Sequence, residues 1–278
     1  MTISILGCGW LGLPLGRSLA QEGYTVKGST TSEKKLQDIK NAGIDPFLLS
    51  VPGTLQADDN RSFFESDILF LNIPPTRGNP DVETDYPDVI RQVTERAVSS
   101  GVSWIIFASS TSVYPDSLDI CVEEAAEKGH ASRPTGEALI TCEQELMNRD
   151  DCSATILRFG GLYGPGRHPV RYLAGKTDLP DPAKPVNLIH LDDCINIVKQ
   201  VIYQQRKNRI YNAVSDGHPP RKTLYKTIAE RSNLTPPTFL KKNGRGGKVV
   251  PNRKLKEEID YTFHYPNPLD YEPENDAD

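Results

Sequence analysis

The sequence predicts an α/β fold built on a doubly wound parallel sheet. In the first half of the chain, short apolar runs alternate with amphipathic stretches, the pattern of parallel strands joined by crossover helices. The stretch 67–71 ends in an unbroken apolar run, which is typical of a strand covered on both faces. A glycine-rich turn follows the first apolar run directly. With 278 residues, 37% of them hydrophobic, the chain can bury a sizeable core.

Six parallel strands are expected, separated by helices. The predicted strands cover residues 2–6, 24–27, 44–49, 67–71, 102–108 and 154–158. The first helix, 10–22, has Leu11, Leu15 and Leu19 at helical spacing and ends at Gly23. Further helices are expected at 33–42, 88–100 and 136–148, and the proline-rich stretch 73–87 is expected to be a loop.

The turn after the first strand carries the strongest motif of the chain, a G-x-G-x-x-G formed by Gly7, Gly9 and Gly12. Gly7 permits a tight turn, Gly9 lets a pyrophosphate approach the backbone, and Gly12 lets helix and strand pack closely. The amides of Trp10 and Leu11 then face the phosphates at the start of the helix. The motif therefore predicts a dinucleotide site of the Rossmann type. The alternative is a glycine-rich turn that binds nothing.

The end of the second strand favours NADP over NAD. An acidic residue there would hold the ribose 2'-hydroxyl of NAD. The chain instead has the hydroxyls of Ser29, Thr30, Thr31 and Ser32, followed by Lys34 and Lys35, which suit a 2'-phosphate. Alternatively, Thr31 or Ser32 caps the next helix and the lysines form its solvated face.

Two further segments are assigned to the cofactor. Ile73, Pro74 and Pro75 follow the fourth strand at its carboxyl end, where doubly wound sheets bind ligands. We expect them to border the adenosine half of the cofactor, with a plain structural turn as the alternative. Phe159, which directly follows the sixth strand, completes this expected set.

The second half of the chain predicts a smaller α/β lobe. After the glycine-rich stretch 160–169 the pattern loosens into a short segment at 187–190, a helix at 192–205, a strand at 209–212 and a helix near 223–232. We divide the chain into a dinucleotide-binding domain, residues 1–160, and a substrate lobe interleaved with the sheet, residues 161–270. The acidic residues 271–278 lack core-forming side chains and are expected to fray.

Several motifs in one order resemble the extended short-chain dehydrogenase/reductases, the NAD(P)-dependent epimerase/dehydratase superfamily. Residues 107–114 look like its S-S-x-x-V-Y-G segment, 157–166 like L-R-x-x-x-x-Y-G-P-G, 187–193 like F-I-H-V-D-D, 210–212 like its Y-N strand and 248–265 like its C-terminal K-x-x-x-N-x-K-L pattern. The G-W-L-G opening is similar to a bacterial, uncharacterised branch of atypical members.

The sequence departs from the family's motifs at two places. Extended members open with G-x-x-G-x-x-G, whereas this chain has the shorter motif. The superfamily's Tyr-x-x-x-Lys dyad falls on Thr135 and Leu139 when the family's helix glutamate is aligned on Glu143. Neither residue can act as the acid/base that tyrosine and lysine form together. Ser110 matches the family's hydroxyl that hydrogen-bonds the substrate oxygen.

Replacements for the dyad are sought among tyrosines and histidines near the expected cleft. Tyr114 is taken as the catalytic partner of Ser110, and Tyr163, His168 and His190 are alternatives. Each of them is equally a candidate for a purely structural role.

A cluster of basic side chains is expected to bind the substrate. Arg167, His168, Arg171 and Lys176 follow the glycine-rich stretch and could hold a phosphate or carboxylate. A solvated charged face is the alternative.

Two functions fit these observations. One is an NADP-dependent, epimerase/dehydratase-like oxidoreductase acting on a hydroxyl or carbonyl of a polar, anionic metabolite with a non-standard acid/base. The other is a catalytically silent NADP-binding sensor or scaffold. The net charge of −5 argues against a nucleic-acid partner, and no apolar run reaches membrane-spanning length. Five scattered cysteines without a C-x-x-C pair suit a reducing compartment, and the N-terminus does not resemble a leader, so a cytoplasmic location is expected. A monomer or homodimer without a bound metal is also expected.

Overall fold

The computed structural model describes residues 1–53, 55, 60–76, 78–241 and 247–272. Its main element is a parallel sheet of seven strands in the order β3-β2-β1-β4-β5-β6-β9. These strands are β1 (Thr2–Leu6), β2 (Thr25–Thr30), β3 (Asp45–Leu48), β4 (Ile68–Leu71), β5 (Trp104–Ser110), β6 (Ser153–Phe159) and β9 (Arg209–Ala213). The predicted fold class, a doubly wound α/β fold of the Rossmann type, is confirmed.

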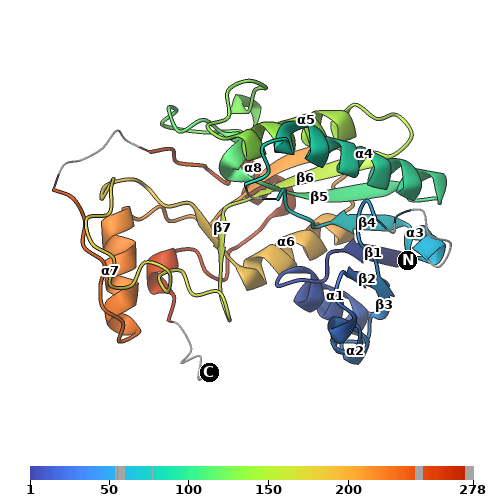
Figure 1. Cartoon of the computed structure of the whole chain (residues 1–278), viewed down its shortest axis with the longest axis horizontal. Coiled ribbons are helices and arrows are strands. Elements are labelled where there is room, and N and C mark those ends of the chain that lie inside the picture. The colour runs from blue at the N-terminus through green and yellow to red at the C-terminus, as the bar shows by residue number, and fades with distance from the viewer. Residues whose placement is uncertain (54, 56–59, 77, 242–246, 273–278) are drawn as a thin grey trace.

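Helices cover both faces of this sheet (Figure 1). The longer ones are α1 (Gly12–Gln21), α4 (Val82–Ser99), α5 (Pro134–Met147), α6 (Leu191–Tyr203) and α7 (Arg221–Arg231). The shorter ones are α2 (Leu36–Asn41), α3 (Arg61–Phe64) and α8 (Arg253–Ile259). Single turns of 3₁₀-helix occupy Glu33–Lys35, Thr111–Val113, Glu123–Ala125 and Pro268–Asp270.

Two apolar layers hold the sheet. On one face α1, α2, α6 and α8 pack against side chains such as Ile3, Ile5 and Phe70. On the other face α3, α4 and α5 pack against Leu69 and Phe107. All four residues of β4 are buried, because this strand lies in the middle of the sheet with a helix layer on each side.

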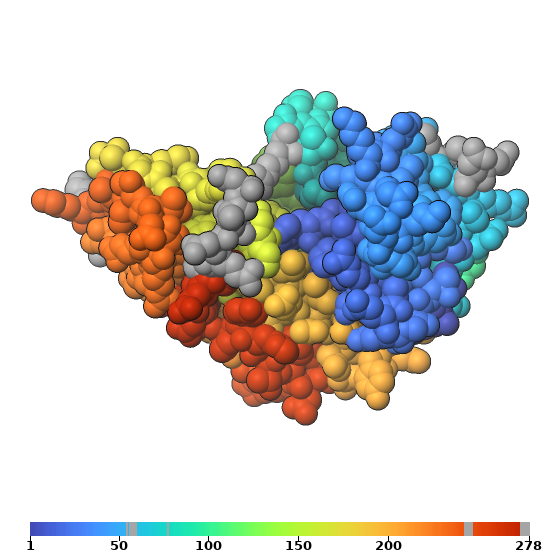
Figure 2. All heavy atoms as spheres, turned by 90° about the horizontal axis from the view of Figure 1, so that it is seen from below, coloured from blue at the N-terminus to red at the C-terminus, as the bar shows by residue number. Residues whose placement is uncertain are grey.

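A second lobe lies beyond the carboxyl ends of the strands (Figure 1). It contains a two-stranded parallel sheet, β7 (Gly161–Tyr163) and β8 (Leu188–His190), together with α7. A separate apolar cluster that includes Tyr163, Leu224, Ile228 and Tyr271 holds it. Figure 2 shows this lobe, in yellow and orange, on the opposite side of a hollow from the blue N-terminal residues.

Four features differ from the sequence-based expectation. The strand expected in the smaller lobe is β9, which pairs with β6 as a seventh strand of the main sheet. Helix α4 begins at Val82, inside the expected loop, and contains Pro87, while α3 was not expected. Tyr271 is only 6% exposed and packs in the core, so fraying does not begin there. The rest of the predicted frayed tail, 273–278, lies outside the described residues. The division at residue 160 stays a prediction.

Candidate dinucleotide site

The loop between β1 and α1 requires glycine at two of its three motif positions. Gly7 has φ +105°, and a Cβ there would lie 2.7 Å from the carbonyl oxygen of Asn72. A Cβ on Gly12 would overlap the carbonyl oxygen of Gly7. At Gly9, by contrast, a Cβ would meet no atom within 4 Å. Packing therefore explains Gly7 and Gly12, whereas Gly9 faces open space.

Ser29 of β2 and Asn72, which follows β4, fix the position of this loop. The amide of Gly7 donates to Ser29 Oγ at 3.0 Å, and the amide of Cys8 donates to the Ser29 carbonyl at 2.8 Å. On the other side, Asn72 Nδ2 donates to the Gly7 carbonyl at 3.1 Å. Ser29 was expected to bind the cofactor, but it is 2% exposed and its hydroxyl holds the loop instead. Asn72 was not assigned to the site from the sequence, although its place at the end of an apolar strand was a usable signal.

The first turn of α1 is suited to an anion. Among the described residues no side chain caps this helix, and its first turn contains no acidic residue. The amides of Trp10 and Leu11 lie in the turn that leads into α1, which the Leu13 amide closes on the Gly9 carbonyl at 3.1 Å, and so lie at the positive end of the helix dipole. The Leu11 side chain is 3% exposed, so only its backbone is placed to contact a ligand.

The segment after β2 exposes part of the expected 2'-phosphate set. Thr30 is 9% exposed, and its hydroxyl accepts a hydrogen bond from the Ser32 amide at 3.2 Å. Thr31 and Lys34 are exposed and Ser32 is half-buried. The Ser32 side chain makes no capping hydrogen bond to the following turn. Three groups, Thr31, Ser32 and Lys34, are thus presented to solvent beside the loop.

The proline-rich turn after β4 contacts the glycine loop. Ile73 Cγ2 lies beside Gly7, and the Ile73 carbonyl accepts a hydrogen bond from Tyr86 Oη at 2.7 Å. Pro74 is exposed and Pro75 half-buried. The structure therefore brings this turn to the predicted cofactor loop. Phe159 is at the expected edge, but it is 4% exposed and packs in the core.

The surroundings of Tyr114 indicate a structural role, whereas the sequence predicted a catalytic one. Its side chain is fully buried, and its hydroxyl donates to Asn212 Oδ1 at 2.7 Å and accepts from Arg158 Nη1 at 2.8 Å. Burial raises the pKa of this phenol well above its usual range. A substrate has no exposed part of Tyr114 to contact.

The Ser110 hydroxyl is placed to donate a hydrogen bond to a ligand. It ends β5, is half-buried, and its Oγ accepts a hydrogen bond from the Ser112 amide at 3.1 Å. A hydroxyl that accepts one hydrogen bond can still donate another to a ligand oxygen. On the neighbouring helix α5, Thr135 is half-buried and Leu139 is 3% exposed among core side chains.

The other candidate acid/base groups are hydrogen-bonded or buried, and the buried hydroxyl of Tyr163 has no hydrogen-bond partner among the described residues. His168 Nδ1 accepts from the Val170 amide, and its Nε2 lies 2.9 Å from Ser232 Oγ. His190 is 2% exposed, stacks on Tyr265 with ring centroids 3.6 Å apart, and has its pKa lowered by burial. Tyr163 is fully buried. These placements favour structural roles for all three.

The four expected substrate ligands are not gathered at one point. Arg167 lies over the indole of Trp10, 5.2 Å from the ring centroid, and therefore beside the glycine loop. His168 contacts Ser232, just past the end of α7. Arg171 and Lys176 lie exposed on the segment that follows.

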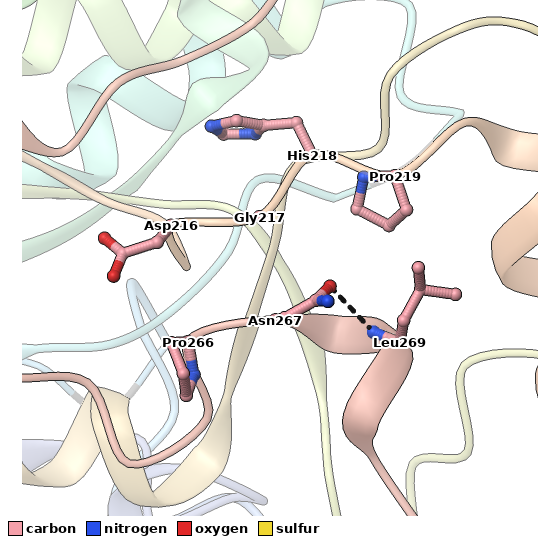
Figure 3. Close-up of a pocket in the computed structure, with 7 residues that line it drawn as sticks. All are labelled: Asp216, Gly217, His218, Pro219, Pro266, Asn267 and Leu269. Carbon is pink, nitrogen blue, oxygen red and sulfur yellow. Dashed lines mark hydrogen bonds between the residues drawn. The ribbon is translucent and has the colours of Figure 1, made fainter.

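A pocket that the sequence did not predict lies after β9 (Figure 3). It has a volume of about 460 Å³ and is lined by residues 216–219 with Pro266, Asn267 and Leu269. The buried Nδ1 of His218 has no hydrogen-bond partner in the described part of the chain, and burial lowers the pKa of this imidazole. The strand that leads into the pocket, β9, is four strands from β1, a separation of roughly 19 Å across the sheet.

Comparison with known proteins places the chain in a family. No family model matches the sequence. Protein YeeZ of Escherichia coli K12 is 35% identical over 270 residues, which cover 96% of this chain and 97% of that protein. The chain belongs to the YeeZ family.

Solved structures of epimerases share the fold of this YeeZ family member. UDP-glucose 4-epimerase of Thermotoga maritima superposes with a TM-score of 0.78 at 16% identity, covering 97% of this chain and 96% of that one. UDP-glucuronic acid 4-epimerase of Bacillus cereus, in complex with UDP-glucuronic acid and NAD, gives 0.76 at 18%, covering 98% of each chain. The expected resemblance to NAD-dependent epimerase/dehydratases is therefore confirmed at the level of the fold.

The described residues contain no helix long and apolar enough to cross a bilayer. They also contain no group of three or more histidine, cysteine, aspartate or glutamate side chains arranged to hold a metal ion.

Proposed function

We propose that the chain binds NADP(H) at the carboxyl edge of the sheet, with the phosphates on the loop from Gly7 to Gly12. The observation that carries this proposal is the contrast between the three glycines. Gly7 and Gly12 are required by neighbouring atoms, whereas Gly9 has no neighbour within 4 Å and lies next to uncapped helix amides. A Cβ at Gly9 would occupy the space through which a pyrophosphate approaches those amides.

The preference for the 2'-phosphate rests on the segment after β2. Thr31, Ser32 and Lys34 offer two hydroxyl donors and one ammonium group to solvent there. Ser29 and Thr30 are only 2% and 9% exposed, so they are left out of the proposed ligand set. A 2'-phosphate is recognised by donors and positive charge, whereas the ribose of NAD calls for a carboxylate.

The first candidate function is an oxidoreductase that acts on a hydroxyl or carbonyl of a polar, anionic metabolite. The bound cofactor would supply hydride transfer at its nicotinamide. Ser110 would donate a hydrogen bond to the substrate oxygen from the end of β5, and the exposed Arg171 and Lys176 would attract its negative charge. The acid/base of such a reaction would be non-standard, because Tyr114, Tyr163, His168 and His190 are all engaged in packing or hydrogen bonds.

The second candidate function is a silent NADP(H)-binding protein that senses the cofactor or holds a partner. The environments of Tyr114 and Leu139 favour it. The phenol lies inside a buried hydrogen-bond network, and an apolar side chain packs in the core where the family's lysine is expected. We propose on this basis that the usual dyad is missing.

Equilibrium titration with NADPH and NADH tests the shared part of both functions. We expect tighter binding of NADPH, and Lys34→Gln is expected to reduce that preference while leaving NADH binding unchanged. Gly9→Ala should weaken the binding of both cofactors, and Gly9→Asp should weaken it further. Neither variant should change the melting temperature, because a side chain at this position meets no protein atom within 4 Å. Failure of the wild-type chain to bind either cofactor would overturn the proposal.

Single-turnover oxidation of bound NADPH with a panel of anionic carbonyl compounds separates the two functions. The oxidoreductase predicts oxidation with at least one compound, slowed about 10²-fold or more in Ser110→Ala without a matching change in cofactor affinity. The silent protein predicts no oxidation above the solvent rate in either variant.

A further inference from the structure

Trp10 and Arg167 form a contact between the glycine loop and the second lobe that neither the fold nor the proposed chemistry requires. The indole Nε1 of Trp10 donates to the carbonyl of Pro165 at 2.7 Å. The guanidinium of Arg167 lies over the same indole, 5.2 Å from its centroid. Both partners of Trp10 come from one short turn that follows β7, more than 150 residues away in the chain.

That turn is built to hold one conformation. The amide of Arg167 donates to the Gly164 carbonyl at 2.9 Å, and the Gly164 amide returns a bond to the Arg167 carbonyl at 3.3 Å. Pro165 stands at the second position and Gly166, with φ +67°, at the third, as a type II turn requires. The backbone of Arg167 is therefore fixed beside Trp10, and only its side chain is free to adjust.

The Arg167 guanidinium has an aromatic partner but no counter-ion among the residues that the structure describes. Within the described ranges, no carboxylate lies in ion-pair distance of it and none of its five N–H groups makes a hydrogen bond. A cation over an exposed ring gains only about 0.5–1 kcal/mol, far less than a guanidinium gains from two oxygens of a phosphate. The side chain is thus positioned with its donors unused.

The ligand chemistry follows from what lies next to it. Trp10 also lies in the turn that leads into α1, so its guanidinium partner and the proposed anion-binding amides lie next to the same residue. We infer that Arg167 is a ligand of the cofactor's pyrophosphate, donated by the second lobe, and not a substrate ligand as its sequence neighbours suggest. This inference rests on the proposed cofactor site. It makes cofactor binding depend on both lobes.

Paired titrations with NADPH and NADH test the assignment. Arg167→Gln is expected to raise the dissociation constants of both cofactors about tenfold and by the same factor, because the pyrophosphate is common to them. Arg167→Lys should recover part of the loss. Lys34→Gln should raise the dissociation constant of NADPH alone. Arg61→Gln is the matched control, since Arg61 is exposed, pairs only loosely with Glu65 at 3.9 Å, and precedes β4 at the amino ends of the strands.

The outcomes separate the inference from the proposal beneath it. If the wild-type chain binds a cofactor and Arg167→Gln binds it equally well, the pyrophosphate assignment is wrong and the cofactor site stands. A loss restricted to NADPH would place Arg167 at the 2'-phosphate and would also overturn the assignment. If the wild-type chain binds neither cofactor, the proposed function fails first and the inference with it.

Discussion

Replacing Arg158 by leucine is expected to destabilise the fold severely. Arg158 is 3% exposed, and its guanidinium donates to Glu143 from Nε at 3.1 Å and from Nη2 at 2.6 Å, with further bonds to the Tyr114 hydroxyl and the Glu123 carbonyl. Leucine replaces the apolar part of the arginine side chain but removes the counter-ion of the Glu143 carboxylate. That carboxylate, also 3% exposed, then keeps its hydrogen bond from the Ser109 hydroxyl at 2.5 Å. Removing one partner of a buried ion pair costs about 3–5 kcal/mol.

Urea unfolding measures this loss as a lower midpoint at an unchanged slope. The loss is attributed to the buried Glu143 carboxylate, which in the variant keeps the Ser109 hydroxyl as a partner but has lost the guanidinium.

The double variant Arg158→Leu with Glu143→Leu is the control for this reasoning. It removes both charges, so it should recover most of the stability. A loss below about 1 kcal/mol in the single variant, or a double variant that is no more stable than the single one, would contradict the role of this pair.

Three other predictions concern single positions. Gly12→Ala should lower stability by about 1–3 kcal/mol in urea unfolding and abolish cofactor binding, because its Cβ would overlap the Gly7 carbonyl; an unchanged midpoint would contradict this packing. Tyr114→Phe should cost about 1–3 kcal/mol by stranding buried partners, while any turnover per folded molecule stays the same; a selective loss of turnover would restore its catalytic role. Burial lowers the pKa of His190, so the folded state binds its proton less readily than the unfolded state, and stability should fall as the pH drops below about 6.5. His190→Asn keeps the cap on the Asp192 amide and should remove that part of the pH dependence; identical profiles for the two proteins would refute the assignment.

The parts of the site that depend on local sequence could be predicted. The roles of Gly7 and Gly12 follow from steric limits within one strand, turn and helix, so the motif was sufficient to place the loop. The turn formed by Ile73 and Pro75 was located correctly for a related reason: parallel strands all present their carboxyl ends at one edge.

The parts that depend on distant segments could not be predicted. Tyr114 was expected in the cleft, but Arg158 from β6 and Asn212 from β9 draw its hydroxyl into the core. The grouping of Arg167 with Arg171 reflected proximity in the chain, whereas its actual neighbour is Trp10. Neither contact leaves a signal in the spacing of the residues concerned.

Two errors in the fold have similar causes. The short run that forms β9 lies far along the chain from β6, so its pairing with that strand could not be inferred from order alone. Pro87 was interpreted as the end of a loop because proline removes a helical hydrogen bond. In the structure it is a buried residue within α4, whose other side chains pack against the sheet.

Fluorescence of Trp10 during NADPH titration tests the central claim most directly. The chain has two tryptophans, and Trp104 is buried in the sheet, so Trp104→Phe leaves Trp10 as the reporter at the glycine loop. The account predicts saturable quenching of Trp10 with sensitised nicotinamide emission, and the loss of both signals in the Gly9→Asp variant at an unchanged melting temperature. No spectral change with NADPH, or an equal change in Gly9→Asp, would contradict the proposed cofactor site.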